Sequence, residues 1–290
     1  MFDDFTRGTF DSDGVDIAYW TAGSGPPLLL IHGYPQTHVM WHKLAPALSR
    51  RFTVVAPDLR GYGDSAKPAG DKDHANYSKR TMAADLVGLM ASLGHDRFAV
   101  AGHDRGARVA YRMALDHKAA VERVAVLDIV PTKKVYDATD RALATGYFHW
   151  FMLIQRSPIP ENLIGGAVDT WLDMAFGNWA GVKDAFTPEA RAEYRRCFAS
   201  PEAIHASCED YRAGATVDYA NDAATIAAGD KIAAPLLALW GEHGRVAALD
   251  PQATWRDYAA DVRGHSLDCG HFLPEERPEE TLAALLDFFA

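Results

Sequence analysis

The sequence predicts an α/β fold in which helices flank a mostly parallel sheet and a helical segment is inserted between two strands. Short apolar runs alternate with helical patterns before residue 131 and again after residue 229, whereas the segment between them shows helical patterns alone. Such alternation implies parallel strands joined by right-handed helical crossovers. The chain has 290 residues, 48% of them hydrophobic, so it can bury one such core and still carry an insertion.

The elements before residue 131 are expected in a definite order. Residues 9–20 predict a strand pair around the turn Asp13-Gly14, because Asp-Gly between two strand patterns is a hairpin signal. Residues 27–31 form a continuous apolar run, which is typical of a parallel strand buried on both faces. The remaining patterns predict a helix at 41–49, a strand at 52–56, a helix at 78–93 ended by Gly94, and strands at 98–102 and 121–128 with a helix between them.

The middle of the chain has a different texture. From residue 131 to about residue 229, short helical patterns rich in Trp, Tyr and Arg follow one another without a strand pair. The alternation resumes with a strand at 236–240, a helix near 251–260, a strand near 263–267 and a last helix from Pro274. We therefore expect a core domain at 1–131 and 229–290 and a helical cap at 132–228, which covers the strand ends where ligands bind.

Composition excludes several classes of function. A net charge of −10 opposes binding to nucleic acids and to anionic membranes, so an anionic substrate needs cationic side chains at its site. No apolar run approaches the length of a membrane span, and the acidic start of the chain lacks the features of a signal peptide. Three cysteines lack metal or redox spacing, and we expect free thiols in a cytoplasmic protein that has neither a metal nor a cofactor.

The sequence Gly-His-Asp-Arg-Gly at residues 102–106 has the form of a nucleophile elbow, a sharp turn between a strand and a helix. Glycines flank the strained central residue because they lack Cβ. Asp104 occupies the position where serine would attack acyl carbons, and a carboxylate can instead displace a leaving group from an sp³ carbon and form an ester. The alternative is that Asp104 only caps the following helix.

A nucleophile of this kind needs a base and an acid that orients the base. His271 lies in a loop between the last strand and the last helix, and the order nucleophile, acid, histidine is typical of hydrolases with such an elbow. Asp128 ends the strand at 121–128 and is the predicted acid. Glu242, in the loop after the strand at 236–240, is the alternative. The backbone N–H groups of Tyr34 and Arg105 are the predicted oxyanion hole for hydrolysis of the ester.

Two groups of side chains point to an anionic substrate and an anionic leaving group. Arg105 and Arg108 share one face of the helix after the elbow and predict a clamp for a carboxylate, whereas Arg112 is expected to be solvated. In the cap, His149, Trp150 and Tyr211 offer neutral or weakly acidic N–H and O–H donors that would suit a departing halide. The neighbouring aromatic residues Tyr147, Phe148 and Phe151 are expected to pack in the core.

Together these motifs resemble the fluoroacetate dehalogenases (haloacetate dehalogenases) of the α/β-hydrolase superfamily. The resemblance covers nearly the whole chain and rests on His-Gly-Tyr-Pro at 32–35, Gly-His-Asp-Arg-Gly-Ala-Arg at 102–108, Leu-Asp-Ile-Val-Pro-Thr at 127–132, His-Trp at 149–150, Glu-Asp-Tyr-Arg-Ala-Gly at 209–214 and Gly-His-Phe-Leu-Pro-Glu-Glu at 270–276.

What the resemblance implies agrees with the roles predicted from the residues. It implies Asp104 as the nucleophile, His271 as the base and Asp128 as its orienting acid. It also implies that Arg105 and Arg108 bind the substrate carboxylate and that His149, Trp150 and Tyr211 bind fluoride. It further implies Trp179 as a residue lining the pocket, and a cofactor-free homodimer. The expected activity is conversion of a haloacetate, such as fluoroacetate, to glycolate and halide through an aspartyl ester.

Two rival functions share parts of this pattern. An epoxide hydrolase uses the same Asp–His–Asp chemistry, and Tyr147 with Tyr211 could protonate the opening oxygen, but Arg105 argues against a neutral epoxide. A ligand-binding protein without catalysis is the other rival, and Asp104, Asp128 and His271 weigh against it. Release of halide from fluoroacetate and chloroacetate, with styrene oxide as a comparison, would separate the three.

Overall fold

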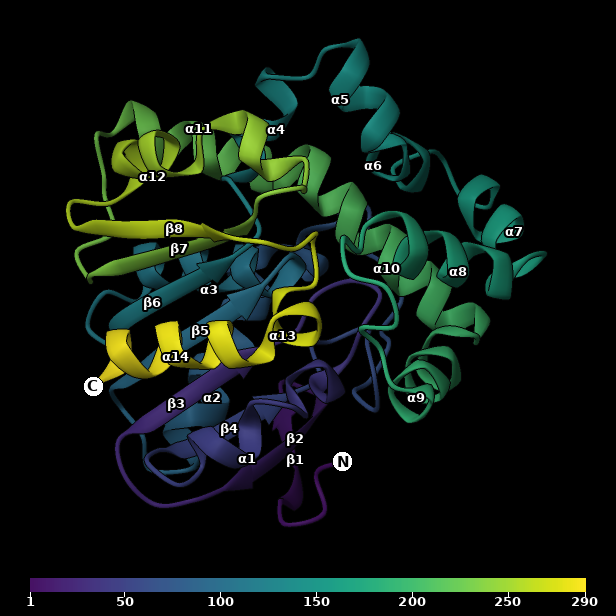
Figure 1. Ribbon diagram of the computed structural model, residues 1–290. Coiled ribbons are helices and arrows are strands. Elements are labelled where there is room, and N and C mark those ends of the chain that lie inside the picture. Colours follow the sequence, from purple (N-terminus) through teal and green to yellow (C-terminus); the bar gives the residue numbers. More distant parts are fainter.

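The computed structural model describes all residues, 1–290, and has an eight-stranded sheet at its centre (Figure 1). The strands lie in the order β1-β2-β4-β3-β5-β6-β7-β8. β2 alone runs in the opposite direction to the other strands. The strand bounds are β1 (Thr6–Ser12), β2 (Val15–Ala22), β3 (Pro27–Ile31), β4 (Thr53–Pro57), β5 (Phe98–His103), β6 (Val121–Leu127), β7 (Leu236–Gly241) and β8 (Val262–Leu267). The predicted α/β class is therefore confirmed.

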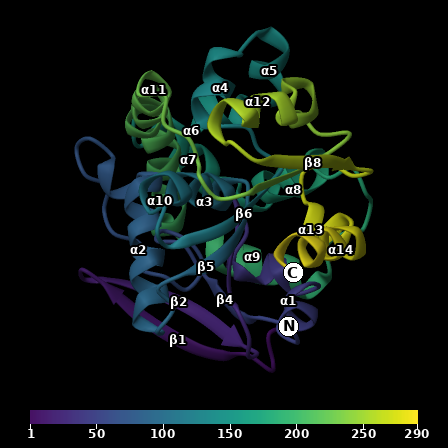
Figure 2. The same ribbon diagram turned by 90° about the vertical axis from the view of Figure 1, so that its left-hand side faces the viewer.

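Helices cover both faces of the sheet. Helices α2 and α3 lie on one face, while α1 and α14 lie on the other (Figures 1 and 2). The bounds of the core helices and helical turns are η1 (His38–Trp41), α1 (Ala45–Leu48), η2 (Ala75–Tyr77), α2 (Lys79–Ser92), α3 (Arg105–Asp116), η4 (Val246–Leu249), α12 (Pro251–Tyr258), α13 (Leu273–Glu276) and α14 (Pro278–Phe289). None of the helices is both long enough and apolar enough to span a bilayer.

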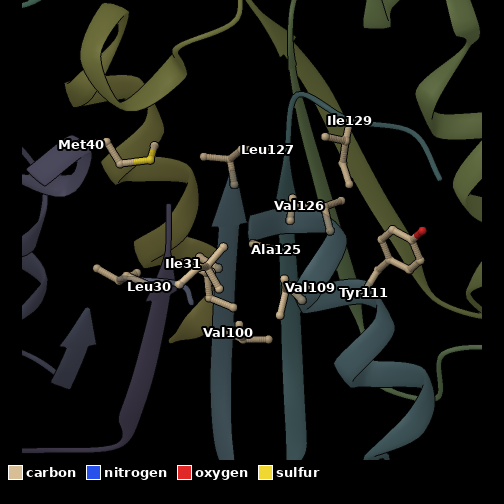
Figure 3. Packing of buried hydrophobic residues seen from close by; sticks show 14 of the residues in the cluster. Leu30, Ile31, Met40, Val100, Val109, Tyr111, Ala125, Val126, Leu127 and Ile129 are labelled. Atoms are coloured by element: carbon tan, nitrogen blue, oxygen red, sulfur yellow. The ribbon is translucent and has the colours of Figure 1, made fainter. Parts of the chain in front are cut away.

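The central strands are apolar throughout because both of their faces are covered. Leu30 of β3, Val100 of β5 and Val126 of β6 are buried, and they belong to the same apolar cluster as Val109 and Tyr111 of α3 (Figure 3). This burial explains the continuous apolar runs, which are typical of parallel strands between two helical layers. Because the central strands are packed on both faces, they hold the polar residues that follow their carboxyl ends in fixed positions.

The segment between β6 and β7 contains no strand. Its helices lie beyond the carboxyl ends of the central strands, except that α4 and α11 lie near α12 (Figure 1). The bounds are α4 (Thr132–Asp137), α5 (Arg141–Gly146), α6 (Phe148–Leu153), α7 (Ile159–Gly165), α8 (Val168–Asn178), α9 (Pro188–Phe198), α10 (Pro201–Ala213), a π-helical turn (Gly214–Asp218) and α11 (Tyr219–Ala227). The domain boundaries at residues 131 and 229 stay a prediction.

Two expected helices are interrupted. The single helix expected at 41–49 is instead the turn η1 followed by the short helix α1, and Pro46 lies in the first turn of α1. The last helix, expected to run from Pro274, is divided into α13 and α14, with Pro278 at the start of the second. Proline lacks the N–H that a continuing helix needs, so each helix restarts at its proline.

Candidate active site

Asp104 lies in a strained turn between β5 and α3. Its backbone has φ 45° and ψ −117°, and its side chain makes no capping hydrogen bond to α3. A Cβ on Gly102 would lie 2.5 Å from the Gly106 oxygen, and a Cβ on Gly106 would lie 2.2 Å from the His32 oxygen. Glycine is therefore required on both sides of the turn. The turn has the geometry of a nucleophile elbow, and although Asp104 occupies the N-cap position of α3, its side chain does not cap the helix.

The carboxylate of Asp104 lies where charged and polar groups favour its ionised form. The backbone N–H of Tyr34 donates to Oδ1 at 3.0 Å. Arg105 is the first residue of α3, where backbone N–H groups have no partner within the helix. Burial alone would raise the pKa of Asp104, but His271, His103 and the two arginines lower it below its ordinary value. A buried, ionised carboxylate is a suitable nucleophile.

His271 faces Asp104 on one side and Asp128 on the other. Its Nδ1 lies 2.6 Å from Oδ2 of Asp128, and its Nε2 lies 3.9 Å from Oδ2 of Asp104. The second oxygen of Asp128 accepts the N–H of Gly241 at 2.9 Å. Glu242, the alternative acid, is exposed. Burial would lower the pKa of His271, but its hydrogen bond to Asp128 and the charges of Asp128 and Asp104 raise it.

The main chain of His271 is held by two further residues. Its N–H donates to the carbonyl oxygen of Trp179 in the cap at 2.9 Å, and its own carbonyl lies 2.7 Å from Nε2 of His103. Burial lowers the pKa of His103 to about 3, so this imidazole is neutral and donates through Nε2. The sequence did not predict this contact, although His103 precedes the nucleophile directly.

The two predicted clamp arginines are both buried, but they are placed differently. The fork of Arg105 binds Asp210 through Nε at 2.9 Å and Nη2 at 2.7 Å, which leaves Nη1 without a partner. Nη1 of Arg108 donates to the Val130 carbonyl and to the Thr132 hydroxyl, both at 3.0 Å, and its Nε has no partner. Arg108 borders the main cavity, whereas Arg105 does not. The fork of Arg105 is therefore already taken by a carboxylate of the protein.

Arg112, the third arginine of α3, does not have the solvent exposure that the sequence predicted. Arg112 is buried rather than solvated, because it pairs with Asp116 at 2.6 Å and donates to Thr225 at 3.0 Å. The neighbouring helix α11 supplies Thr225 and covers the position. Sequence spacing alone could not show that α11 covers this face of α3.

The three predicted halide donors pack against one another. The ring of Tyr211 lies 5.9 Å from that of His149 and 6.0 Å from that of Trp150, both edge to face. Burial lowers the pKa of His149 to about 3, and its Nδ1 has no hydrogen-bond partner. The guanidinium of Arg108 lies 4.6 Å from the centre of the Trp150 ring. The arrangement offers neutral donors beside a cation, which suits a small anion.

A cavity of about 560 Å³ joins most of these groups. Among the predicted site residues, those that line it are Asp104, Arg108, Asp128, His149, Trp150, Trp179 and His271. Three other predicted site residues are buried but do not line the cavity: Tyr34, Arg105 and Tyr211. Tyr147 and Phe148, which were expected in the core, line the cavity instead, and so do His243 and Arg245, for which the sequence predicted no role. No group of three or more His, Cys, Asp or Glu side chains is arranged to hold a metal ion.

The chain belongs to the α/β-hydrolase fold family, whose sequence profile matches residues 26–278. It is 44% identical to a fluoroacetate dehalogenase from Burkholderia sp, over 100% of this chain and 95% of that protein. It is also 37% identical to a soluble epoxide hydrolase from Corynebacterium sp. (strain C12), over 96% of this chain and 95% of the relative. A crystal structure of an α/β hydrolase from Nostoc sp PCC 7120 superposes with a TM-score of 0.98 at 54% identity, covering 100% of this chain and 99% of the other. The predicted resemblance to the fluoroacetate dehalogenases is therefore confirmed.

Proposed function

We propose that this protein hydrolyses haloacetates to glycolate and halide. The observation that carries the proposal is a carboxylate nucleophile at the elbow, facing a His271–Asp128 pair across 3.9 Å and lying beside buried arginines with unpartnered N–H groups. A carboxylate suits displacement at an sp³ carbon. Cationic side chains let the carboxylate of the substrate enter a protein whose net charge is −10.

The first step is displacement at the α-carbon. An oxygen of Asp104 attacks from the side opposite the halogen, a C–O bond forms, and the carbon–halogen bond breaks with its electron pair on the halide. Arg108, which borders the cavity, binds the carboxylate of the substrate, and the positive charge of the neighbouring Arg105 supports this binding. The donors of His149, Trp150 and Tyr211 stabilise the leaving halide. Because charge on the halide grows only as the bond breaks, these donors favour the transition state over the ground state.

The second step is hydrolysis of the ester. Nε2 of His271 takes a proton from water, and the water oxygen attacks the ester carbonyl of Asp104. The backbone N–H groups of Tyr34 and Arg105 stabilise the resulting oxyanion. When the intermediate collapses, the glycolate oxygen leaves with the proton from His271, and Asp104, which now carries one oxygen from water, releases the second water proton to solvent and returns to its carboxylate form. Asp128 keeps the imidazole in the tautomer and orientation that this step requires.

Trapping of the ester tests the proposal. His271→Ala should react once with chloroacetate and stop, and mass spectrometry should find the carboxymethyl ester on the peptide containing Asp104. Asp104→Asn is the matched control and should acquire no adduct there. If a stoichiometric mixture gives no adduct on His271→Ala, the protein does not use this mechanism.

Epoxide hydrolysis is the second candidate, and two observations favour it. The soluble epoxide hydrolase relative spans nearly the whole chain, and the cavity of about 560 Å³ lies in the size range that holds drug-sized ligands, which is far more than a haloacetate fills. Tyr147 borders that cavity, and the ring of Tyr211 lies 6.0 Å from that of Trp150, which also lines the cavity. Turnover of styrene oxide without turnover of any haloacetate would replace the first proposal by this one.

A further inference from the structure

Glu276 is a buried carboxylate that binds four backbone N–H groups and no cation. It ends α13 and is 4% exposed. Oε2 accepts the N–H groups of Gly270 at 2.8 Å, Gly181 at 2.7 Å and Val182 at 2.9 Å, and Oε1 accepts that of Phe272 at 2.8 Å. A buried charge without a cation is costly unless hydrogen bonds satisfy it, and here the four amides do so.

These four amides belong to two segments that meet beside His271, the catalytic base. Gly270 and Phe272 flank His271, while Gly181 and Val182 belong to the cap loop, residues 179–182. The same loop supplies the Trp179 carbonyl that accepts the N–H of His271. One carboxylate therefore links the loop of the base to the loop that supports it.

The cap loop and the loop of His271 lie so close together that there is no space for a side chain at either of the two glycines where they meet. A Cβ on Gly181 would lie 2.6 Å from the nitrogen of Gly270, and a Cβ on Gly270 would lie 2.3 Å from the nitrogen of Gly181. Trp179, at the start of the cap loop, lines the cavity, and its ring lies 6.0 Å from that of His271. A small displacement of either loop would therefore change the position of the imidazole and the wall of the cavity together.

Glu275 provides a contrast on the same helix. It is also buried, but its carboxylate points elsewhere: it accepts the hydroxyl of Tyr194 at 2.5 Å and lies 3.5 Å from the amino group of Lys43. The carboxylate of Glu275 thus shares the burial of its neighbour, but it makes no hydrogen bond to the backbone N–H groups of the loops at 179–182 or 270–272.

We infer that Glu276 is a positioning residue for His271. Its carboxylate holds the loop at 270–272, which carries the base, and the cap loop at 179–182 in the relative position that ester hydrolysis needs. The inference rests on the proposed function. Of the two chemical steps, only ester hydrolysis uses His271, because Asp104 forms the ester without a base. Loss of Glu276 should therefore slow the second step and leave the first largely intact.

The test separates the two steps in Glu276→Gln. A glutamine amide keeps the size of the side chain but places an NH₂ donor against at least one backbone N–H. With chloroacetate in rapid-quench mass spectrometry, hydrolysis of the Asp104 ester should slow by about 10–100-fold, since a displacement of about 1 Å can cost roughly 100-fold. The rate of ester formation should change far less, so the ester should accumulate at steady state. Glu275→Gln is the matched control and should leave the ratio of the two rates unchanged.

Gly181→Ala provides a second variant in case Glu276→Gln fails to fold. It leaves the carboxylate intact but forces the two loops apart, and it should give the same accumulation of ester. Equal slowing of both steps in whichever variant folds would show a general structural role and overturn the inference.

Hydrogen exchange provides a readout that does not depend on the reaction. Amides at 179–182 and 270–272 should lose protection together in Glu276→Gln, or in Gly181→Ala, and keep it in Glu275→Gln. Unchanged protection in either segment would overturn the inference. If the wild-type protein and His271→Ala form no ester while the two segments lose protection together, the proposed function fails but the link between the loops stands.

Discussion

The imidazole of His271 lies between two carboxylates, and only one of them keeps its charge during the reaction. In the resting protein, burial lowers the pKa of His271, while Asp128 and Asp104 raise it above the ordinary 6.5. Formation of the ester removes the charge of Asp104 but not that of Asp128. The pKa of His271 should therefore be lower in the ester than in the free protein, so a larger fraction of the base is neutral when it must accept a proton.

This difference predicts two separate pH midpoints. In the wild-type protein, hydrolysis of the Asp104 ester should slow on acidification, because protonated His271 cannot act as a base, and the midpoint should lie below the pKa of His271 in the free protein. Rapid-quench mass spectrometry after a pH jump measures the first value, and an NMR titration of the imidazole measures the second. Equal midpoints would show that the charge of Asp104 does not act on His271.

Arg108 is the residue that we expect to recognise the substrate carboxylate, because it borders the cavity and Arg105 does not. Haloacetamide should be a poor substrate relative to haloacetate, since losing a buried charged partner costs about 2–5 kcal/mol, or roughly 30-fold or more in kcat/KM. Arg108→Gln should remove most of this preference. Arg112→Gln, which alters a buried arginine paired with Asp116, should keep the preference. Equal rates for the acid and the amide in the wild-type protein would refute recognition of a carboxylate.

At the scale of secondary structure, the sequence predicts best what lies at the ends of the parallel strands. Asp104 follows β5, Asp128 follows β6 and His271 follows β8, and the carboxyl ends of parallel strands meet at one edge of a sheet. The three residues could therefore be grouped from the sequence alone. The alternation of apolar and helical patterns predicted the strands for the same reason, because both faces of the central strands are buried.

Contacts between the cap and the core could not be predicted in this way. Asp210 in α10 binds Arg105, which lies 105 positions earlier in the chain, and no periodic pattern connects the two residues. The same holds for Thr225 beside Arg112. The sequence predicted that the cap is helical, but the crossing of its helices over α3 depends on packing between elements, which spacing within one element does not encode.

The pairing of α10 with α3 and α2 predicts that Asp210 is important for folding. Its carboxylate binds Arg105 and Lys79, both fully buried, and although burial opposes it, their charges hold the pKa of Asp210 below its usual range. Asp210→Asn would leave two buried cations without their partner, and breaking a buried pair costs about 3–5 kcal/mol. The free energy of unfolding in urea should fall by about that amount.

A surface pair provides the control for this measurement. Asp169 and Arg195 are exposed, and exposed pairs contribute about 0–1 kcal/mol, so Asp169→Asn should change little. A loss in Asp210→Asn no larger than that in Asp169→Asn would show that Arg105 and Lys79 find other partners.

For the whole molecule, the net charge of the protein and the charge of the proposed substrate are both negative. The chain carries −10, and the exposed cation at the cavity is Arg245, while Arg108 is buried. Salt reduces the range of repulsion between exposed charges from about 30 Å at 0.01 M to about 10 Å at 0.1 M, but it screens buried groups much less. Added salt should therefore weaken the repulsion of the substrate while leaving its contact with Arg108 intact.

This balance predicts that kcat/KM for chloroacetate rises as ionic strength increases from 0.01 M to about 0.1 M, whereas kcat stays constant. Sodium gluconate is a suitable salt because it adds no halide, and competition by its anion would act in the opposite direction. Chloroacetamide, which is neutral, should show no such rise. Arg245→Gln should make the rise for chloroacetate steeper, because the variant loses the one exposed cation that attracts the substrate to the cavity. A fall in kcat/KM with salt in the wild-type protein would show instead that cations at the entrance, and not the net charge, govern the approach of the substrate.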